Sequence, residues 1–199
     1  MKKVLLFAFA LALGASSVAQ TSGYEKSIEI NGGFSLDDYQ NYTFGIGMVN
    51  GYRINDNFYV GLGIGYEYLK GLYYKSYEYV GGIIGSKNYT SEDIRNNIQI
   101  FGRIKANLTS SKVSPFLSCD LGYNAGLGGN NIKMATGLFY EPAFGIDFKM
   151  SDEQTIYFTI GYNSQNYEYK FYNLTLGNSY DKIENVKAGK LNLRLGFKF

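Results

Sequence analysis

The chain contains no histidine, no tryptophan, one cysteine and only two prolines among its 199 residues. Without histidine it lacks the side chain that most often serves as a general base near neutral pH. With Cys119 alone it cannot form an intramolecular disulfide. Beyond the N-terminal segment there is no run of 18 or more apolar residues. The sequence therefore gives no support to histidine-based catalysis, to a disulfide framework or to a helical membrane domain.

The N-terminal residues differ in character from the rest of the chain. Lys2 and Lys3 precede an apolar run over residues 4–15, and small residues follow. This order is typical of a secretory signal peptide, and the run is too short to cross about 30 Å of hydrocarbon. We predict a cleaved signal peptide over residues 1–19 and one domain over residues 20–199. Cleavage would leave 17 basic against 17 acidic residues, a balance that gives no support to nucleic-acid binding.

What the chain has in abundance is tyrosine (20), glycine (25) and phenylalanine (14), and its apolar residues alternate with polar ones or glycine. In the last segment, apolar side chains occupy every second position from Leu191 to Phe199. Successive side chains of a strand point to opposite faces, so this pattern predicts a strand with one apolar face. Seven similar segments lie upstream, at about 28–34, 44–54, 58–68, 94–108, 117–127, 138–149 and 156–163. We predict an all-β fold, an eight-stranded antiparallel up-and-down transmembrane β-barrel.

The connections between these segments alternate in length. Short polar turns are predicted at residues 55–57, 109–112 and 151–154, and longer loops at 35–41, 71–93, 128–135 and 165–188. Short turns at one end and long loops at the other are typical of outer-membrane barrels, whose loops face the exterior. Residues 167–171 still alternate, which indicates that strands continue into the longest loops.

The aromatic residues of the apolar face gather at two levels. They lie near the loop ends and near the turn ends of the segments, as Tyr42, Tyr66, Tyr68, Tyr123, Tyr140 and Tyr162, and as Tyr52, Phe58, Phe148, Phe197 and Phe199. Two such levels are typical of the interfacial girdles of a membrane barrel. A soluble lipocalin-like carrier would be apolar inside and polar outside. We predict the opposite arrangement, with Cys119 on the outward face.

The polar face predicts a lumen filled with charges. Its ionisable residues are Glu29, Arg53, Glu67, Arg95, Arg103, Lys105, Asp120, Glu141, Asp147, Lys149, Arg194 and Lys198. Buried charges must be paired, and both signs are present, so we expect a salt-bridged plug. Gly61, Gly63 and Gly65 would leave space for long side chains such as Arg103 and Arg194.

The chain end carries a resemblance to a known family. Residues 193–199, Leu-Arg-Leu-Gly-Phe-Lys-Phe, resemble the C-terminal signal of Gram-negative outer-membrane proteins. Together with the signal peptide and the eight segments, the chain resembles small porin-like barrel domains of the OmpA/OmpX type. The resemblance implies an outer-membrane location, contact with membrane lipid, a monomer, and recognition by the barrel-assembly machinery through the strand at 191–199.

The sequence leaves the activity open between three interpretations. We expect a non-enzymatic integral outer-membrane protein with a structural role or with binding mediated by the loops at 71–93 and 165–188, which an extracellular ligand or protein would contact. A narrow solute or ion channel is the first alternative, and a lipid-modifying enzyme is the second. We assign no catalytic, cofactor-binding or metal-binding residues. The pair Asp37-Asp38 fits a solvated loop better than a calcium site.

Overall fold

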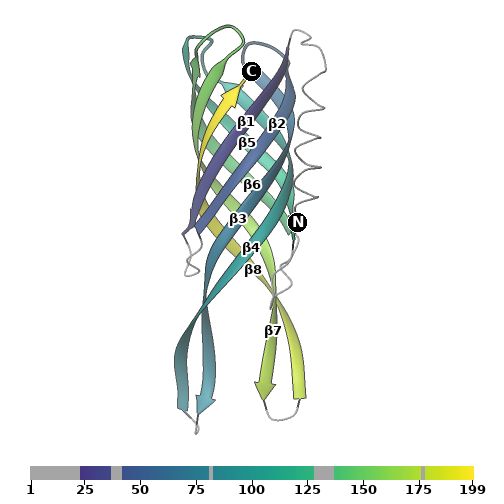
Figure 1. Ribbon diagram of the computed structural model, residues 1–199, viewed down its shortest axis with the longest axis vertical. Helices are drawn as coiled ribbons and strands as arrows, with labels where there is room; N and C mark the ends of the chain where they lie inside the picture. Colours follow the sequence, from purple (N-terminus) through teal and green to yellow (C-terminus); the bar gives the residue numbers. More distant parts are fainter. Residues whose placement is uncertain (1–22, 37–41, 81–82, 128–136, 176–177) are drawn as a thin grey trace.

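The computed structural model describes residues 23–36, 42–80, 83–127, 137–175 and 178–199, and within these the side chains of all but 71–95 and 166–188. Eight strands make up this part of the chain: β1 (Tyr24–Ser35), β2 (Tyr42–Arg53), β3 (Phe58–Val80), β4 (Ile83–Asn107), β5 (Val113–Gly126), β6 (Gly137–Lys149), β7 (Thr155–Thr175) and β8 (Asn178–Lys198). They form a closed barrel in chain order, β1 to β8 (Figure 1). Among the described residues no helix is long and apolar enough to cross a membrane. The predicted eight-stranded, up-and-down antiparallel barrel is confirmed.

The barrel closes between its first and last strands. β1 pairs antiparallel with β8 from Ser27 opposite Lys198 to Ser35 opposite Lys190. The pairing reaches the last residue, because the amide of Phe199 donates to the carbonyl of Lys26 at 2.9 Å. Closure leaves the described wall without a free sheet edge, so its backbone polar groups are paired within it except at a gap of two pairs between β6 and β7.

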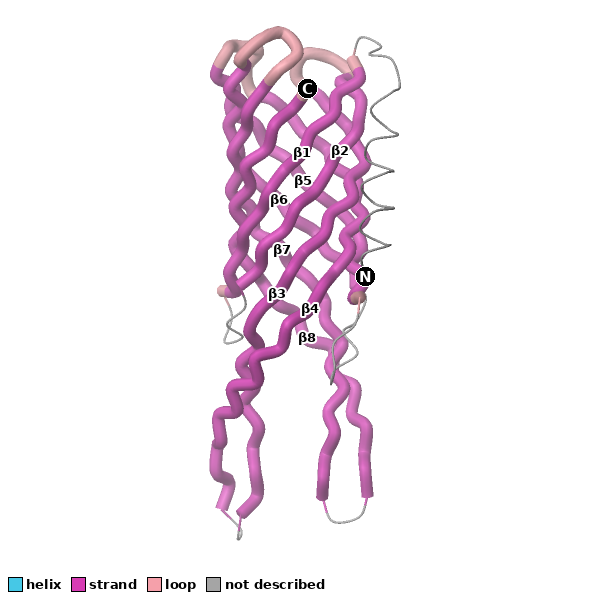
Figure 2. Tube along the Cα trace, viewed as in Figure 1, coloured by secondary structure: helices cyan, strands magenta, loops and turns pink. Residues whose placement is uncertain are grey.

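The short turns lie where the sequence predicts them, at the end of the barrel called here the turn end (upper end in Figures 1 and 2). In the first turn, the amides of Asn57 and Phe58 both donate to Oδ1 of Asn55, each at 2.9 Å. In the last, the amide of Met150 donates to the carbonyl of Gln154 at 2.9 Å. The side chain of Asn55 replaces water as the acceptor for two turn amides, which explains a polar residue there.

The opposite end of the barrel, called here the hairpin end, differs from the prediction. The regions predicted as loops, residues 71–93 and 165–188, are largely strand: β3 stays paired with β4 as far as Val80 opposite Ile83, and β7 with β8 as far as Thr175 opposite Asn178. The loop assignment was wrong there, and the predicted continuation of strands is confirmed. Each of these strands has 21 to 25 residues, whereas about 9–11 suffice to cross a membrane. Two separate hairpins therefore project beyond the wall (Figure 2).

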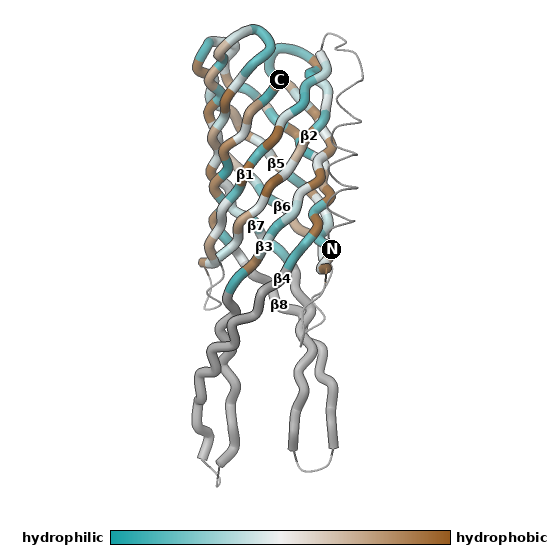
Figure 3. The backbone as a smooth tube through the Cα atoms, in the orientation of Figure 1, coloured by the Kyte–Doolittle hydropathy of each residue, from teal (hydrophilic) through white to brown (hydrophobic). Residues whose placement is uncertain are grey.

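Buried and exposed residues alternate along the strands of the described barrel, and hydrophobic and polar residues alternate along the tube in Figure 3. Large apolar side chains are exposed on the outer face of every strand, for example Leu62 at 74% and Leu121 at 66%. Nine of the eleven predicted girdle residues are outward and exposed, as Tyr42, Tyr123, Tyr140 and Tyr162, and as Tyr52, Phe58, Phe148, Phe197 and Phe199. Tyr66 and Tyr68 are only half-exposed, and Cys119 is exposed. An apolar belt around a whole molecule does not suit water, whereas it suits the hydrocarbon core of a bilayer.

Candidate functional site: a filled lumen

The centre of the lumen is built around Arg103 on β4. Its guanidinium donates to both carboxylate oxygens of Asp120 on β5 (2.7 and 2.8 Å) and to both of Glu29 on β1 (2.8 and 3.0 Å). All three side chains are buried. Asp120 is the direct register partner of Arg103, whereas Glu29 reaches it from across the barrel. The bidentate geometry satisfies the planar guanidinium fork on two sides, which is the arrangement that makes a buried ion pair tolerable.

Arg194 on β8 extends this central cluster. It donates to Asp120 at 2.6 Å and forms an ion pair with Glu141 on β6. Glu141 also accepts hydrogen bonds from the side-chain amides of Asn163 (2.8 Å) and Asn192 (3.1 Å). Two guanidinium groups and three carboxylates from β1, β4, β5, β6 and β8 thus join opposite walls of the barrel in one network.

A second group of polar contacts lies toward the turn end. The Lys105 ammonium contacts both carboxylate oxygens of Asp147 at 2.7 Å, and Asn107 donates to the same carboxylate at 2.8 Å. At the rim, Glu25 accepts from Arg53 and from Lys198, the latter at 3.2 Å. The rim side chains keep 15–19% of their exposure, so water reaches them more readily than it reaches the central cluster.

Toward the hairpin end, Lys190 forms a buried ion pair with Glu67, and Gln99 donates to Glu67 at 3.3 Å. The described lumen therefore holds six cations and six carboxylates in ion pairs. They are Arg53, Arg103, Lys105, Lys190, Arg194 and Lys198, with Glu25, Glu29, Glu67, Asp120, Glu141 and Asp147. The expected salt-bridged lumen is present, and its charges balance.

Aromatic rings fill much of the space between these charges. Five rings are buried in the lumen: Tyr59, Phe101, Phe116, Phe139 and Tyr157. Each ring lies against a glycine, and a Cβ atom on that glycine would overlap the ring. The pairs are Tyr59 with Gly61, Phe101 with Gly63, Phe116 with Gly145, Phe139 with Gly122, and Tyr157 with Gly196. The glycines were predicted to make space for arginine, but at positions 61 and 63 the space is occupied by rings. Glycine is required there because the wall and a large lumen side chain approach closely.

Some rings also contact charged groups. The Lys105 ammonium lies 3.7 Å from the centroid of the Phe116 ring, and the Arg103 guanidinium 5.3 Å from that of Phe101. The Tyr157 hydroxyl donates to Glu29 at 2.9 Å. These cation–π contacts and hydrogen bonds lower the cost of burying charge inside the barrel.

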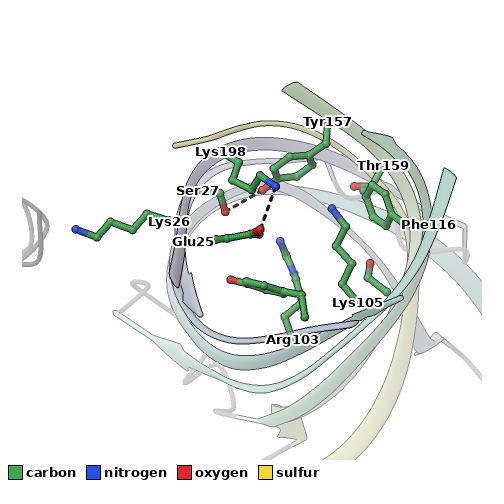
Figure 4. Close-up of a pocket in the computed structure, with 11 residues that line it drawn as sticks. Glu25, Lys26, Ser27, Arg103, Lys105, Phe116, Tyr157, Thr159 and Lys198 are labelled. Carbon is green, nitrogen blue, oxygen red and sulfur yellow. Dashed lines mark hydrogen bonds and ion pairs between the residues drawn. The ribbon is translucent and has the colours of Figure 1, made fainter. Parts of the chain in front are cut away.

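Little free space remains at the turn end of the lumen (Figure 4). A cavity of about 20 Å³ lies among Glu25, Tyr59, Arg103, Lys105, Tyr157 and other residues. Such a volume holds about one water molecule. In Figure 4 the side chains of Glu25, Arg103, Lys105 and Lys198 point into the lumen from β1, β4 and β8, whereas Lys26 points away from it.

Polar atoms without a protein partner concentrate elsewhere in the lumen. Nine buried side-chain atoms form no hydrogen bond among the described residues; they belong to Asn31, Thr43, Glu67, Asn97, Asn124, Thr159, Asn163 and Asn192. Asn31, Thr43 and Asn124 lie on the hairpin-end halves of their strands, and Glu67 and Asn97 pair with the hairpin-end parts of β2 and β5, opposite Gly45 and Gly126. A buried polar group without a partner costs about 1–3 kcal/mol, so we expect water on many of these atoms.

The predicted lumen charges fall into three groups. Ten of the twelve line the lumen as predicted. Lys149 does not: it is exposed beside the turns, where its ammonium donates to the carbonyl of Ser110 at 3.2 Å, because β6 ends there. The side chain of Arg95 lies outside the described part, as do residues 1–22 with the predicted signal peptide, and Asp37-Asp38.

Sequence reasoning missed several lumen residues. Glu25 and Lys190 share the inward face of β1 and β8 with residues that were predicted, so the alternation could have identified them. The five lumen aromatics also occupy inward positions. The alternation places them inward as well, and they were missed because aromatic side chains were expected on the outward face, in the girdles.

The described residues contain no group of three or more His, Cys, Asp or Glu side chains arranged to hold a metal ion. Glu29, Asp120 and Glu141 come close to one another only through the two arginines between them. Their oxygens are occupied as acceptors, so the cluster acts as an ion-pair network.

Comparisons with known proteins identify the fold. No protein-family model matches the chain, and no curated protein matches it by sequence. Among solved structures it is similar to the outer membrane protein OprG from Pseudomonas aeruginosa (TM-score 0.60, 11% identity, 91% of this chain and 98% of that one). It is also similar to Neisserial surface protein A (TM-score 0.52, 18% identity, 91% and 100%) and to the outer membrane protein AlkL in lipid bilayers (TM-score 0.50, 12% identity, 92% and 92%). The chain has the outer-membrane β-barrel fold.

Proposed function

We propose that this protein is an integral, monomeric and non-enzymatic barrel of the outer membrane whose lumen is sealed, and that it serves as a scaffold for its two projecting hairpins. The apolar belt and the fold support the membrane location. The filled lumen carries the proposal of a sealed barrel, since the ion pairs and rings leave a cavity of only about 20 Å³ at the turn end. On this proposal an extracellular ligand or protein binds the hairpins, and residues 191–199 engage the assembly machinery.

Two measurements test the location and the seal. Membrane fractionation followed by electrophoresis with and without boiling should give a detergent-requiring band whose mobility shifts on boiling. Full recovery of the protein from the soluble fraction would refute the membrane location. In planar bilayers the refolded protein should give no discrete conductance steps, and reproducible steps would refute the seal.

The hairpins have their own test. Protease added to intact cells should cut within residues 71–93 or 165–188 and leave the turn at 151–154 intact, because the two sites lie at opposite ends of the barrel. Protease added to opened cells supplies the control, since it reaches both ends. Cleavage at 151–154 in intact cells would reverse the proposed orientation.

A narrow channel is the second candidate, and one observation favours it. The unpartnered polar atoms toward the hairpin end indicate water inside that half of the lumen. Water in the hairpin-end half of the lumen forms a continuous channel only if the ion pairs around Arg103 separate. The conductance recordings decide between the two candidates, and lipid A composition with and without the protein tests the remaining alternative, a lipid-modifying enzyme.

A further inference from the structure

The outer wall of the barrel carries an open hollow of about 450 Å³ that spans β5 to β8. Its sides are the outward residues Leu117, Pro142, Phe144, Ile160, Tyr162 and Leu191. The hollow is open on its outer side, so a chain of methylene groups can enter it from the bilayer.

Pro142 explains why the wall is hollowed at this point. Proline has no amide hydrogen and interrupts a ladder of strand hydrogen bonds. The register between β6 and β7 keeps Tyr140 opposite Ser164 and Ala143 opposite Gly161, but the two pairs between them are missing. The gap lies midway along β6. The hollow thus sits at the middle of the wall, at the level of the hydrocarbon core.

Small side chains form the floor of the hollow. Ser118, Ala143 and Gly161 face the lumen from β5, β6 and β7, and all three line the hollow from behind. Larger residues at these positions would fill the wall from inside. Because the floor is formed by small residues and the sides are apolar, the hollow is shaped for a narrow apolar group entering from outside.

We propose that this hollow binds one acyl chain of a membrane phospholipid. The proposal rests on the membrane location proposed above. The hollow is continuous with the apolar belt, so the bilayer is the medium that covers it, and its outward sides offer no charged group. An empty hollow in this position would leave its lining without contacts, whereas an acyl chain restores them. A phospholipid chain therefore occupies this site in preference to a wall position without such a hollow.

The test uses the full chain refolded in phosphatidylcholine bilayers that contain a phosphatidylcholine with a diazirine midway along one acyl chain. After irradiation, crosslinks mapped by mass spectrometry should concentrate on peptides containing residues 117, 142–144 and 160–162. Ile160→Trp fills the hollow and should lower these crosslinks about tenfold, which corresponds to about 1.4 kcal/mol of binding free energy. The matched control Ile64→Trp, at a similarly exposed outward position on β3, should leave them unchanged.

The outcomes separate this proposal from the proposed function. Crosslinks spread evenly around the belt, or crosslinks at the hollow that survive Ile160→Trp, would overturn the acyl-chain site while the protein stays in the membrane. Loss of the mobility shift on boiling and of all crosslinks in the unaltered protein would instead overturn the membrane location. Leu117→Trp fills the hollow from β5, and it provides the same comparison if Ile160→Trp fails to refold.

Discussion

Replacing Arg103 by alanine tests the central network most directly. The side chain makes four contacts of 2.7–3.0 Å with Asp120 and Glu29. Without it, Asp120 keeps Arg194 at 2.6 Å, but the nearest remaining cation to Glu29 is Arg194 at 3.9 Å. Removing one partner of a buried pair costs about 3–5 kcal/mol, because the other charge stays buried and uncompensated. We expect Arg103→Ala to lower the free energy of unfolding by that amount.

The matched control is Arg53→Ala at the rim. Arg53 also holds a carboxylate, that of Glu25, but both side chains keep 17–19% exposure, so we expect a loss of about 1 kcal/mol or less. Unfolding by denaturant in lipid vesicles, followed by circular dichroism and by mobility on gels, measures both variants. Tryptophan fluorescence is not an option, since the chain has none. Equal losses for the two variants would contradict the conclusion that water reaches the rim more readily than the central cluster.

A second substitution isolates the uncompensated charge. In Arg103→Met with Glu29→Gln, the carboxylate that loses its cation is neutral. We expect this pair to be more stable than Arg103→Met alone, with a coupling energy of about 0.5–3 kcal/mol. No coupling between the two sites would mean that Arg103 acts through its volume and not through its charge.

Two further predictions concern the packing and the facing of the wall. Gly63→Ala should destabilise the barrel by about 1–3 kcal/mol, because the new Cβ atom overlaps the ring of Phe101. Gly102→Ala should change the stability by no more than about 0.5 kcal/mol, because its Cβ atom meets nothing closer than 4.0 Å. Similar unfolding curves for both variants would contradict the packing described. A bimane label on Cys119 should be quenched by nitroxides on lipid chains, and one at position 159, in a variant with Cys119→Ser and Thr159→Cys, should not, because Thr159 is buried in the lumen. Equal quenching would contradict the assigned facing.

The strands of the wall were predictable because every outward side chain must meet the same requirement, which is to be apolar. Any apolar side chain suits hydrocarbon, so the positions from Leu191 to Phe199 and their upstream equivalents show a clean period of two. The same rule holds at the hairpin end: the alternation over residues 167–171 correctly predicts a strand, whereas the assignment of these residues to a loop was wrong. That assignment failed because loop length was inferred from polarity, and a hairpin outside the membrane is polar as well.

The identity of the lumen residues could be predicted from the sequence, but the partner of each charge could not. Which residues face inward follows from the alternation, but which carboxylate Arg103 meets depends on the shear of the closed barrel. That geometry brings Glu29 of β1 to an arginine of β4, 74 positions away. The prediction that the glycines accommodate arginine failed for the same reason. Gly61 contacts the ring of Tyr59 on its own strand and Gly63 that of Phe101 on the next strand, and composition does not show which side chain meets each glycine.

The outer face and the lumen differ in how far their residues can be exchanged. On the outer face most apolar residues are interchangeable, and the hollow over Pro142 is a place where the shape of the wall matters. Inside, each charge has a partner at a fixed distance and each ring has a glycine opposite, so a change at one position must be matched at another. The central cluster carries three carboxylates against two guanidinium groups, and among the described ion pairs the two rim cations around Glu25 balance the extra negative charge. A substitution that removes Arg103 therefore does more than open a gap: it leaves one cation, Arg194, facing three buried carboxylates.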